Sequence, residues 1–149
     1  MCGRLKYQQK THSPGSAIRT LTKEGLADDQ MWGFTDYQNI IYNARSETIQ
    51  QKPLFSEHFK ERRCLILAEG FYEWNNGRPY LVYCPNQILT LGGIWKSNPK
   101  ECVVITKKAE GQLINLHHRM PVIIPQSNWQ TWLNNDQEAP NLFNNYPIK

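Results

Sequence analysis

The chain has 149 residues, 40% of them hydrophobic, and a formal net charge of +4 at pH 7. This length suits one domain, residues 1–149, that can bury a genuine core. No uninterrupted run of about 18 apolar residues occurs, which excludes a membrane-spanning helix, and residues 1–10 lack the apolar region of a secretory signal. We therefore expect a cytoplasmic protein, whose mild positive charge is compatible with a polyanionic partner without identifying one.

The first half of the chain predicts two helices and two strands. Residues 17–25 fit a short helix that ends at Gly25, since glycine commonly terminates helices. Residues 55–63 fit a second helix, because Phe55 and Phe59 lie one turn apart on the same face. Strands are predicted at residues 39–42 and 63–68, and residues 11–16 are typical of a loop.

The second half begins with a predicted hairpin. Asn75-Asn76-Gly77 separates two aromatic, β-branched segments, and Asn-Gly supplies the positive φ angles of a type I′ turn. Further strands are predicted at residues 88–91, 101–106 and 122–124, with a turn at residues 98–101.

A third helix is predicted after residue 127. Ser127 and Gln130 fit a capping box, and Trp129, Trp132 and Leu133 then share one helix face. The total of about seven short strands and three helices predicts an α+β fold. We expect a strand-rich, barrel-like central antiparallel sheet with short peripheral helices.

The four cysteines stand far apart, at Cys2, Cys64, Cys84 and Cys102. Without an export signal a disulfide framework is not expected. The last three lie in apolar runs and fit small core side chains. A zinc site that combines cysteines with His117 and His118 is an alternative, but the spacing matches no common zinc pattern, so we predict no metal and no cofactor.

Cys2 is preceded only by Met1. Methionine is usually removed before a small residue, so we expect a mature chain that begins with Cys2. Its α-amine, with a pKa of roughly 7.7–8.0 against about 10.4 for lysine, would attack an aldehyde far more readily than a lysine does. The adjacent thiol could then close a five-membered thiazolidine ring. The alternative is a frayed terminus without function.

Four short segments hold residue types that neither core strands nor plain loops require. They are residues 2–4 (CGR), 43–48 (NARSET), 69–74 (EGFYEW) and 117–121 (HHRMP). Strand alternation places Glu73 on the face of Phe71, and a carboxylate among aromatic residues is a candidate for a raised pKa and for proton transfer. The alternatives are a solvated glutamate on an edge strand, a polar loop that caps a helix at Ser46, and histidines with structural hydrogen bonds.

Together these segments resemble the motifs of the SRAP (SOS response-associated peptidase) family of abasic-site shielding proteins. The family pattern Met-Cys-Gly-Arg is matched by residues 1–4, NARxE by residues 43–47, GFYEW by residues 70–74 and HxRMP by residues 117–121. RRCL at 62–65 and the Trp-Gly-hydrophobic step at 32–34 also fit. The resemblance extends over nearly the whole chain and implies an SRAP-like fold.

The resemblance implies an enzyme that forms a covalent link to DNA. The amine of Cys2 would form a Schiff base with the aldehyde of an abasic site in single-stranded DNA, and its thiol would close a thiazolidine. By motif, Asn43 would hold the terminus, Glu73 would shuttle protons and His117 would act as acid or base on the sugar hydroxyl. His118 occupies a variable family position. We expect a monomer that is nucleoid-associated when bound to DNA.

Candidate DNA contacts follow from the same motifs. We expect Arg4, Arg45 and Arg119 to bind phosphates, and Trp32 and Phe34 to stack on exposed bases. For Trp32 a place in the core is an equal alternative. The chain departs from the family between residues 4 and 32, where the usual Asn-x-Ala-Pro stretch is missing, which puts the contacts to the DNA beside the lesion in doubt.

Two other functions remain open from the sequence. A thiol peptidase or self-processing hydrolase would pair Cys2 with a histidine such as His117. A single-stranded nucleic-acid-binding module without chemistry would keep its full activity in Cys2→Ala.

Overall fold

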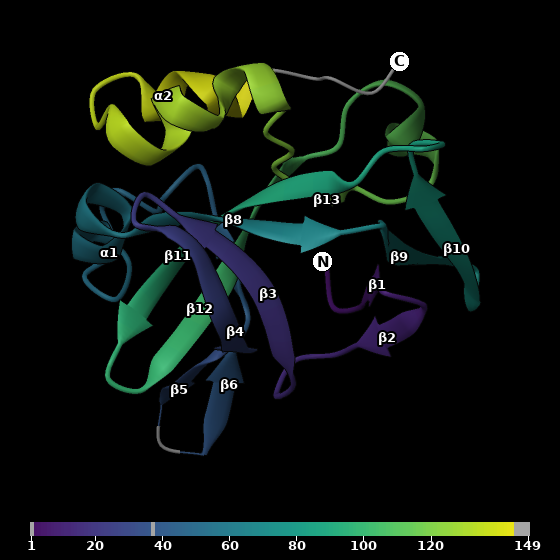
Figure 1. Cartoon of the computed structure of the whole chain (residues 1–149). Coiled ribbons are helices and arrows are strands. Elements are labelled where there is room, and N and C mark those ends of the chain that lie inside the picture. Colours follow the sequence, from purple (N-terminus) through teal and green to yellow (C-terminus); the bar gives the residue numbers. More distant parts are fainter. Residues whose placement is uncertain (1, 37, 145–149) are drawn as a thin grey trace.

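The computed structural model describes residues 2–36 and 38–144, apart from the side chains of residues 26–28. Strands dominate this part of the chain (Figure 1). They are β1 Leu5–Tyr7, β2 Lys10–His12, β3 Ala17–Thr22, β4 Gly25–Trp32, β5 Phe34–Asp36, β6 Asn39–Ile41, β7 Asn43–Arg45, β8 Arg63–Ala68, β9 Gly70–Asn75, β10 Arg78–Tyr83, β11 Leu89–Ser97, β12 Lys100–Lys108 and β13 Arg119–Pro121. The helices are α1 Ser56–Glu61, α2 Trp129–Asn134 and the 3₁₀ turns η1 Gly111–Asn115, η2 Gln126–Asn128 and η3 Ala139–Asn144.

Five strands close into a barrel in the order β11-β8-β3-β4-β12, because β12 also pairs with β11. The helices α1 and α2 lie at one end of this barrel (Figure 1). The predicted α+β, barrel-centred fold is therefore confirmed. The sheet is mixed rather than purely antiparallel, since β12 runs parallel to both β4 and β7.

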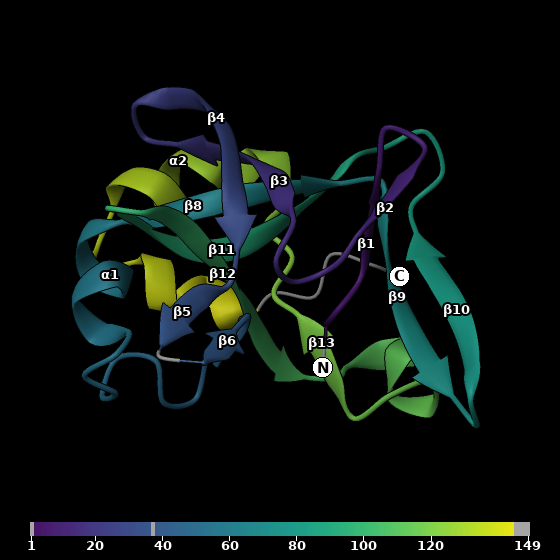
Figure 2. The same cartoon turned by 90° about the horizontal axis from the view of Figure 1, so that it is seen from below.

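A second sheet, in the order β10-β9-β1-β2, stands beside the barrel (Figure 2). Its β9–β10 hairpin turns at Asn76 and Gly77 with φ angles of 53° and 76°, as the Asn-Gly signal predicts. Gly70 begins β9 where a Cβ atom would lie 2.6 Å from the carbonyl oxygen of Val82. Only glycine allows this approach, which brings the GFYEW segment into the sheet.

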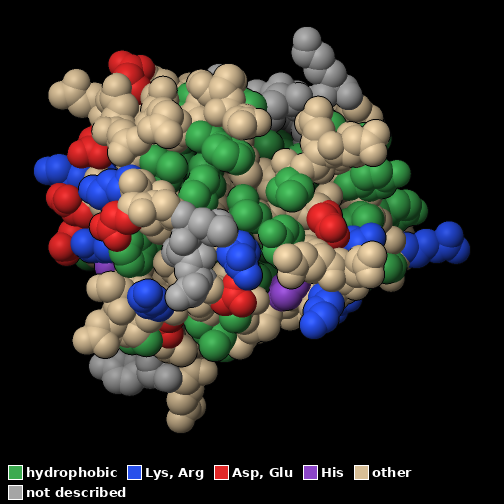
Figure 3. All heavy atoms as spheres, in the orientation of Figure 1, with side chains coloured by type: hydrophobic (Ala, Val, Ile, Leu, Met, Phe, Trp, Pro, Cys, Tyr) green, Lys and Arg blue, Asp and Glu red, His purple; other side chains and the backbone are tan. Residues whose placement is uncertain are grey.

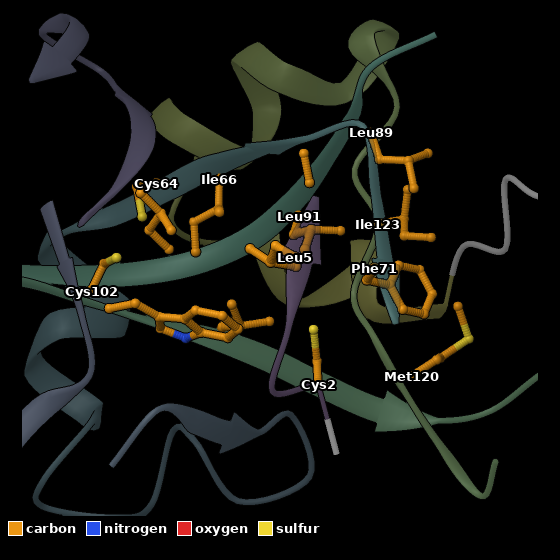
Figure 4. Close-up of a cluster of buried hydrophobic side chains, with 14 of the residues drawn as sticks. Cys2, Leu5, Cys64, Ile66, Phe71, Leu89, Leu91, Cys102, Met120 and Ile123 are labelled. Atoms are coloured by element: carbon orange, nitrogen blue, oxygen red, sulfur yellow. The ribbon is translucent and has the colours of Figure 1, made fainter. Parts of the chain in front are cut away.

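One apolar cluster joins the barrel to the second sheet. It contains Cys64 and Cys102 from the barrel together with Cys2, Leu5 and Phe71 from the second sheet and the arm that leads into it (Figure 4). Cys2 and Leu5, at the start of the described chain, are therefore part of the core.

The predicted helix at 17–25 is wrong, because these residues form β3 and the turn after it. Ile18, Thr20 and Thr22 alternate with more exposed residues and face the barrel interior, as β-branched residues in a strand commonly do. Gly25, with a φ of 117°, serves the β3–β4 turn instead of ending a helix.

The helix predicted from residue 127 forms as α2, but its capping box does not. Its N-cap is Asn128, which makes no side-chain capping hydrogen bond, because η2 precedes the helix and shifts its start. The helix predicted at 55–63 is confirmed as α1 with Phe59 buried. The strands β1, β2, β4, β5 and β7 were not predicted. The strand predicted at residues 122–124 is wrong, because β13 ends at Pro121 and Ile123 forms only an isolated bridge with Leu91.

Candidate functional site

The chain's first described residues run alongside β9. Leu5 and Lys6 pair with Phe71 and Gly70, and the Tyr72 amide donates to the Arg4 carbonyl over 3.0 Å. This register carries Cys2 past β9 into the apolar cluster, where it is fully buried. A frayed terminus is therefore contradicted at Cys2.

Asn43 holds the main chain of Cys2. It begins β7, which lies parallel to β12. The Asn43 side-chain amide donates to the carbonyl oxygens of Cys2 and Tyr42, each over 3.0 Å. Its own oxygen, Oδ1, is buried and has no hydrogen-bond partner among the described residues. Asn43 thus fixes the arm with its donor and leaves an acceptor inside the site.

Glu73 is the acid of the site and is 3% exposed. Its Oε1 is buried without a hydrogen-bond partner in the described chain, and its Oε2 lies 3.7 Å from Nδ1 of His117. Burial disfavours the charged form and raises the pKa of Glu73 to about 7. The solvated-glutamate alternative is thus contradicted, and this carboxyl group can accept or release a proton near neutral pH.

The Cys2 thiol shares this environment. Burial raises its pKa well above the usual value, and the charge of Glu73 raises it further. The sulfur is therefore a neutral thiol until a neighbouring base accepts its proton.

His117 follows η1 and precedes β13. Its Nδ1 accepts a hydrogen bond from the Arg119 backbone amide over 3.0 Å, and its ring stacks on that of His118 with a centroid distance of 4.4 Å. Burial lowers the pKa of His117, which favours a neutral imidazole at neutral pH. The structural-histidine alternative therefore describes part of its role.

The site therefore contains the thiol of Cys2, the amide of Asn43, the carboxyl group of Glu73 with a pKa of about 7, and the neutral imidazole of His117. Such a set suits proton transfers around a reacting carbon rather than metal binding. Within the described ranges, no group of three His, Cys, Asp or Glu residues could hold a metal ion.

Three predicted DNA contacts are contradicted by burial. Trp32 is 0% exposed and Phe34 is 1% exposed, so neither ring can stack on a base. Trp32 donates instead to the Tyr42 carbonyl over 3.0 Å. The Arg119 guanidinium is buried and is bound by Glu47, which leaves it no free face for a phosphate.

A different tryptophan stands in the open. Trp74 is 39% exposed on β9, and the guanidinium of Arg4 lies 4.7 Å from its ring centroid. Exposed apolar side chains gather over the β9–β10 hairpin, with basic side chains beside them (Figure 3). Arg45 is also exposed, at the end of β7. Sequence reasoning missed Trp74, although strand alternation sets it opposite the buried face of Glu73.

Tyr42 and Glu47 were also missed. The Tyr42 ring packs on Gly3, where a Cβ atom would lie 3.5 Å away, so this ring supports the arm. Glu47 pairs with Arg119 and joins two of the sequence motifs. The final glutamate of the NARxE pattern was the only available signal for that second contact.

The fold is a strand-rich barrel. Its candidate site combines a buried cysteine with a carboxylic acid and an imidazole. The family model described as "SOS response associated peptidase (SRAP)" matches residues 22–148, and the chain belongs to this family. None of the described helices is long and apolar enough to cross a membrane.

Curated relatives agree with this assignment. The chain is 32% identical over 113 residues to abasic site processing protein YoqW of Bacillus subtilis, a match that covers 67% of this chain and 50% of YoqW. It is 31% identical over 154 residues to abasic site processing protein HMCES of Xenopus tropicalis, covering 80% of this chain and 46% of HMCES. The chain spans about half the length of these relatives.

Solved structures share the fold. An X-ray structure of a protein from Bacteroides thetaiotaomicron superimposes with a TM-score of 0.78 at 22% identity, covering 93% of this chain and 73% of that protein. A protein from Bordetella bronchiseptica gives a TM-score of 0.79 at 20% identity, covering 93% and 82%.

Proposed function

We propose that this protein shields abasic sites in single-stranded DNA by forming a covalent thiazolidine link through Cys2. The observation that supports this most directly is the placement of Cys2 against Asn43 and beside Glu73, with His117 within reach of the same acid. The names of the relatives, abasic site processing proteins, point to the same substrate.

The chemistry begins once Met1 is removed. The α-amine of Cys2 adds to the C1′ aldehyde of the ring-opened sugar, and loss of water gives an imine. The Cys2 sulfur then bonds to the carbon of the protonated imine, the thiol proton passes to the Glu73 carboxylate, and the C=N electron pair moves to the nitrogen, which closes the five-membered ring. No oxidant or cofactor is needed, and ring closure is favoured because both nucleophiles belong to one residue.

Each neighbour has a role that fits its position. Glu73, with a pKa of about 7, gives a proton to the departing hydroxyl and takes one from the thiol. The buried oxygens of Asn43 and Glu73 that have no hydrogen-bond partner among the described residues would accept hydrogen bonds from the Cys2 α-amine or from the carbinolamine that forms on it. His117 exchanges a proton with the sugar hydroxyl and so speeds the opening of the sugar to the aldehyde.

DNA contact would combine stacking and charge. Trp74, with Arg4 over its ring, offers a stacking surface, and Arg45 is an exposed phosphate ligand at the end of β7. Such contacts need unpaired bases, which favours a single strand over an intact duplex.

A thiol peptidase is less well supported. Its nucleophile requires a lowered thiol pKa, whereas burial and Glu73 raise that of Cys2. In the thiazolidine route the amine attacks first, so a neutral thiol is no obstacle.

The test is a denaturing gel of the purified protein with single-stranded DNA that contains one abasic site. We expect a heat-stable shifted band, no band with intact DNA and none with Cys2→Ala. Mass spectrometry should show that the reacting chain begins at Cys2. A heat-stable band from Cys2→Ser would refute ring closure through sulfur, and peptide cleavage without any band would favour the peptidase.

A further inference from the structure

An ion pair joins the 43–47 segment to the 117–121 segment. The Glu47 carboxylate accepts two hydrogen bonds from Arg119, 2.5 Å from Nη1 and 2.9 Å from Nη2. Arg119 is 3% exposed, and Nη2 also donates to Thr106 Oγ1 over 3.1 Å. The hydrogen bonds from Arg119 lower the pKa of Glu47 to about 2, as expected for a strong, two-pronged pair.

The backbone of the same arginine sets the state of His117. The Arg119 amide donates to His117 Nδ1 over 3.0 Å. An Nδ1 that accepts must be unprotonated, so the proton of the neutral ring lies on Nε2. If the Arg119 backbone moved, Nδ1 could instead donate to the Arg119 carbonyl, which lies 3.2 Å away, and the ring would adopt the other tautomer.

We propose that Glu47 is a positioning residue, which holds Arg119 in place and thereby fixes the tautomer and orientation of the His117 ring in the site. This inference rests on the function proposed above. The carboxylate of Glu47, in the segment that follows β7, matches the fork of the buried guanidinium with two hydrogen bonds and so holds it in one orientation. The proposal also explains why Arg119 is buried rather than directed at DNA.

Among the described residues, the Glu73 carboxylate, the His118 ring and the Arg119 backbone face the His117 ring. Glu73 approaches Nδ1 from β9, His118 stacks on one face, and the Arg119 backbone holds the edge. Any change in the behaviour of His117 must therefore be separated from effects of Glu73 and His118. Within the described residues neither Glu73 nor His118 forms a hydrogen bond or ion pair with Glu47, so a Glu47 variant leaves them in place.

The test uses two variants and one control. Glu47→Gln keeps the length and loses the charge, whereas Glu47→Asp keeps the charge and loses the reach. Glu57→Gln is the matched control, because Glu57 makes only a loose, exposed ion pair with Arg62 at 3.6 Å. We expect both Glu47 variants to crosslink abasic DNA roughly tenfold more slowly, a part of the 10²–10⁴-fold that acid–base groups provide. The control should match the wild type.

The decisive readout is the ¹⁵N NMR spectrum of the His117 ring in the free protein. The wild type should show an unprotonated Nδ1 and a protonated Nε2, and the variants a mixture of both tautomers. An unchanged rate would overturn the proposal, and so would a slower rate with unchanged ring signals, since Glu47 would then act only on stability.

The experiment still tests the proposal if a variant does not fold or if the wild type forms no crosslink. If Glu47→Gln does not fold, Glu47→Asp and the wild-type spectrum still test the proposal. A wild-type ring protonated at Nδ1 would contradict the proposed link between Glu47 and the His117 tautomer. If the wild type forms no crosslink, the proposed function fails, whereas the ring spectra of the free proteins continue to test the Glu47 contact.

Discussion

Two fully buried cysteines of the same apolar cluster, Cys2 and Cys64, have different surroundings (Figure 4). Burial raises the thiol pKa of both. Cys64 lies on β8 inside the barrel, where burial is the whole cause of its shift. Cys2 lies where the barrel meets the second sheet, and there the charge of Glu73 adds to the effect of burial.

The contrast shows that burial alone does not make a reactive thiol. Burial keeps both sulfurs protonated, but at Cys2 the same desolvation brings the pKa of Glu73 to about 7. A base that can take the thiol proton at neutral pH thus stands beside one cysteine and not the other. In the proposed function, the barrel side of the cluster serves stability and the second-sheet side serves chemistry.

The largest effect should separate the two cysteines directly. Cys2→Ala should abolish the heat-stable crosslink, because alanine keeps the α-amine but lacks the sulfur that closes the ring. Cys64→Ala should crosslink at the wild-type rate but lower the free energy of unfolding by roughly 1 kcal/mol, since it leaves a small cavity. Gel assays and urea unfolding would check these outcomes. Loss of crosslinking in a folded Cys64→Ala protein would contradict the division between the two regions.

The next effect concerns Glu73. Glu73→Gln should slow crosslinking about 100-fold, within the range of general acid–base catalysis, because glutamine cannot transfer the proton. Binding to the same abasic DNA, measured by fluorescence anisotropy, should stay within about twofold. If rate and affinity fell equally, Glu73 would have a structural role, as the residues on the barrel side of the cluster do.

The raised pKa of Glu73 also predicts a pH dependence of stability. The folded state holds the Glu73 proton more tightly than the unfolded state, so this stabilisation is fully present below about pH 4.5 and is lost as pH rises through about 7. Glu73→Gln should therefore gain stability relative to the wild type across this window. Urea unfolding at pH 5 and pH 8 would measure it, and a difference that does not grow with pH would argue against a buried, uncharged Glu73.

Local signals predicted several of these features well. The Asn76-Gly77 hairpin depends only on its own φ angles, and the alternation along β9 correctly buries Phe71 and Glu73 while exposing Trp74. The motif residues Asn43 and His117 do lie at the Cys2 site. A few neighbouring residues determine the turn and the alternation, whereas the placement of Asn43 and His117 was expected from the family motifs.

The errors arise where distant contacts decide. Trp32 and Phe34 were expected to stack on bases, with a place in the core as an equal alternative for Trp32. Both side chains are buried by residues distant in the sequence. Residues 17–25 have no strong helical or strand period, and pairing with β4 and β8 selects the strand. The Glu47–Arg119 pair joins residues 72 positions apart, which no local pattern reveals.

A smaller effect contrasts two tryptophans. Trp74→Ala should weaken binding to single-stranded abasic DNA about tenfold, in line with roughly 1–3 kcal/mol for one stacked base, and leave stability nearly unchanged. Trp132→Phe, at a fully buried position of α2, should lower the stability and leave the binding of DNA nearly unchanged. Anisotropy titrations and thermal unfolding of both variants would check this. Equal affinity losses in both would mean that Trp74 acts through the fold and not through a base.

The smallest effect is electrostatic and concerns Arg45. The logarithm of the binding constant should fall steeply with the logarithm of salt concentration, and Arg45→Ala should flatten that slope by about 0.7–1 unit, the value for one lost phosphate contact. Lys52→Ala, which removes an exposed charge with no assigned phosphate, is the control and should leave the slope unchanged. If both variants flattened the slope equally, the DNA would sense the net charge of the protein rather than a phosphate site at the end of β7. Charge would then be no part of what distinguishes the Cys2 side of the molecule from the barrel.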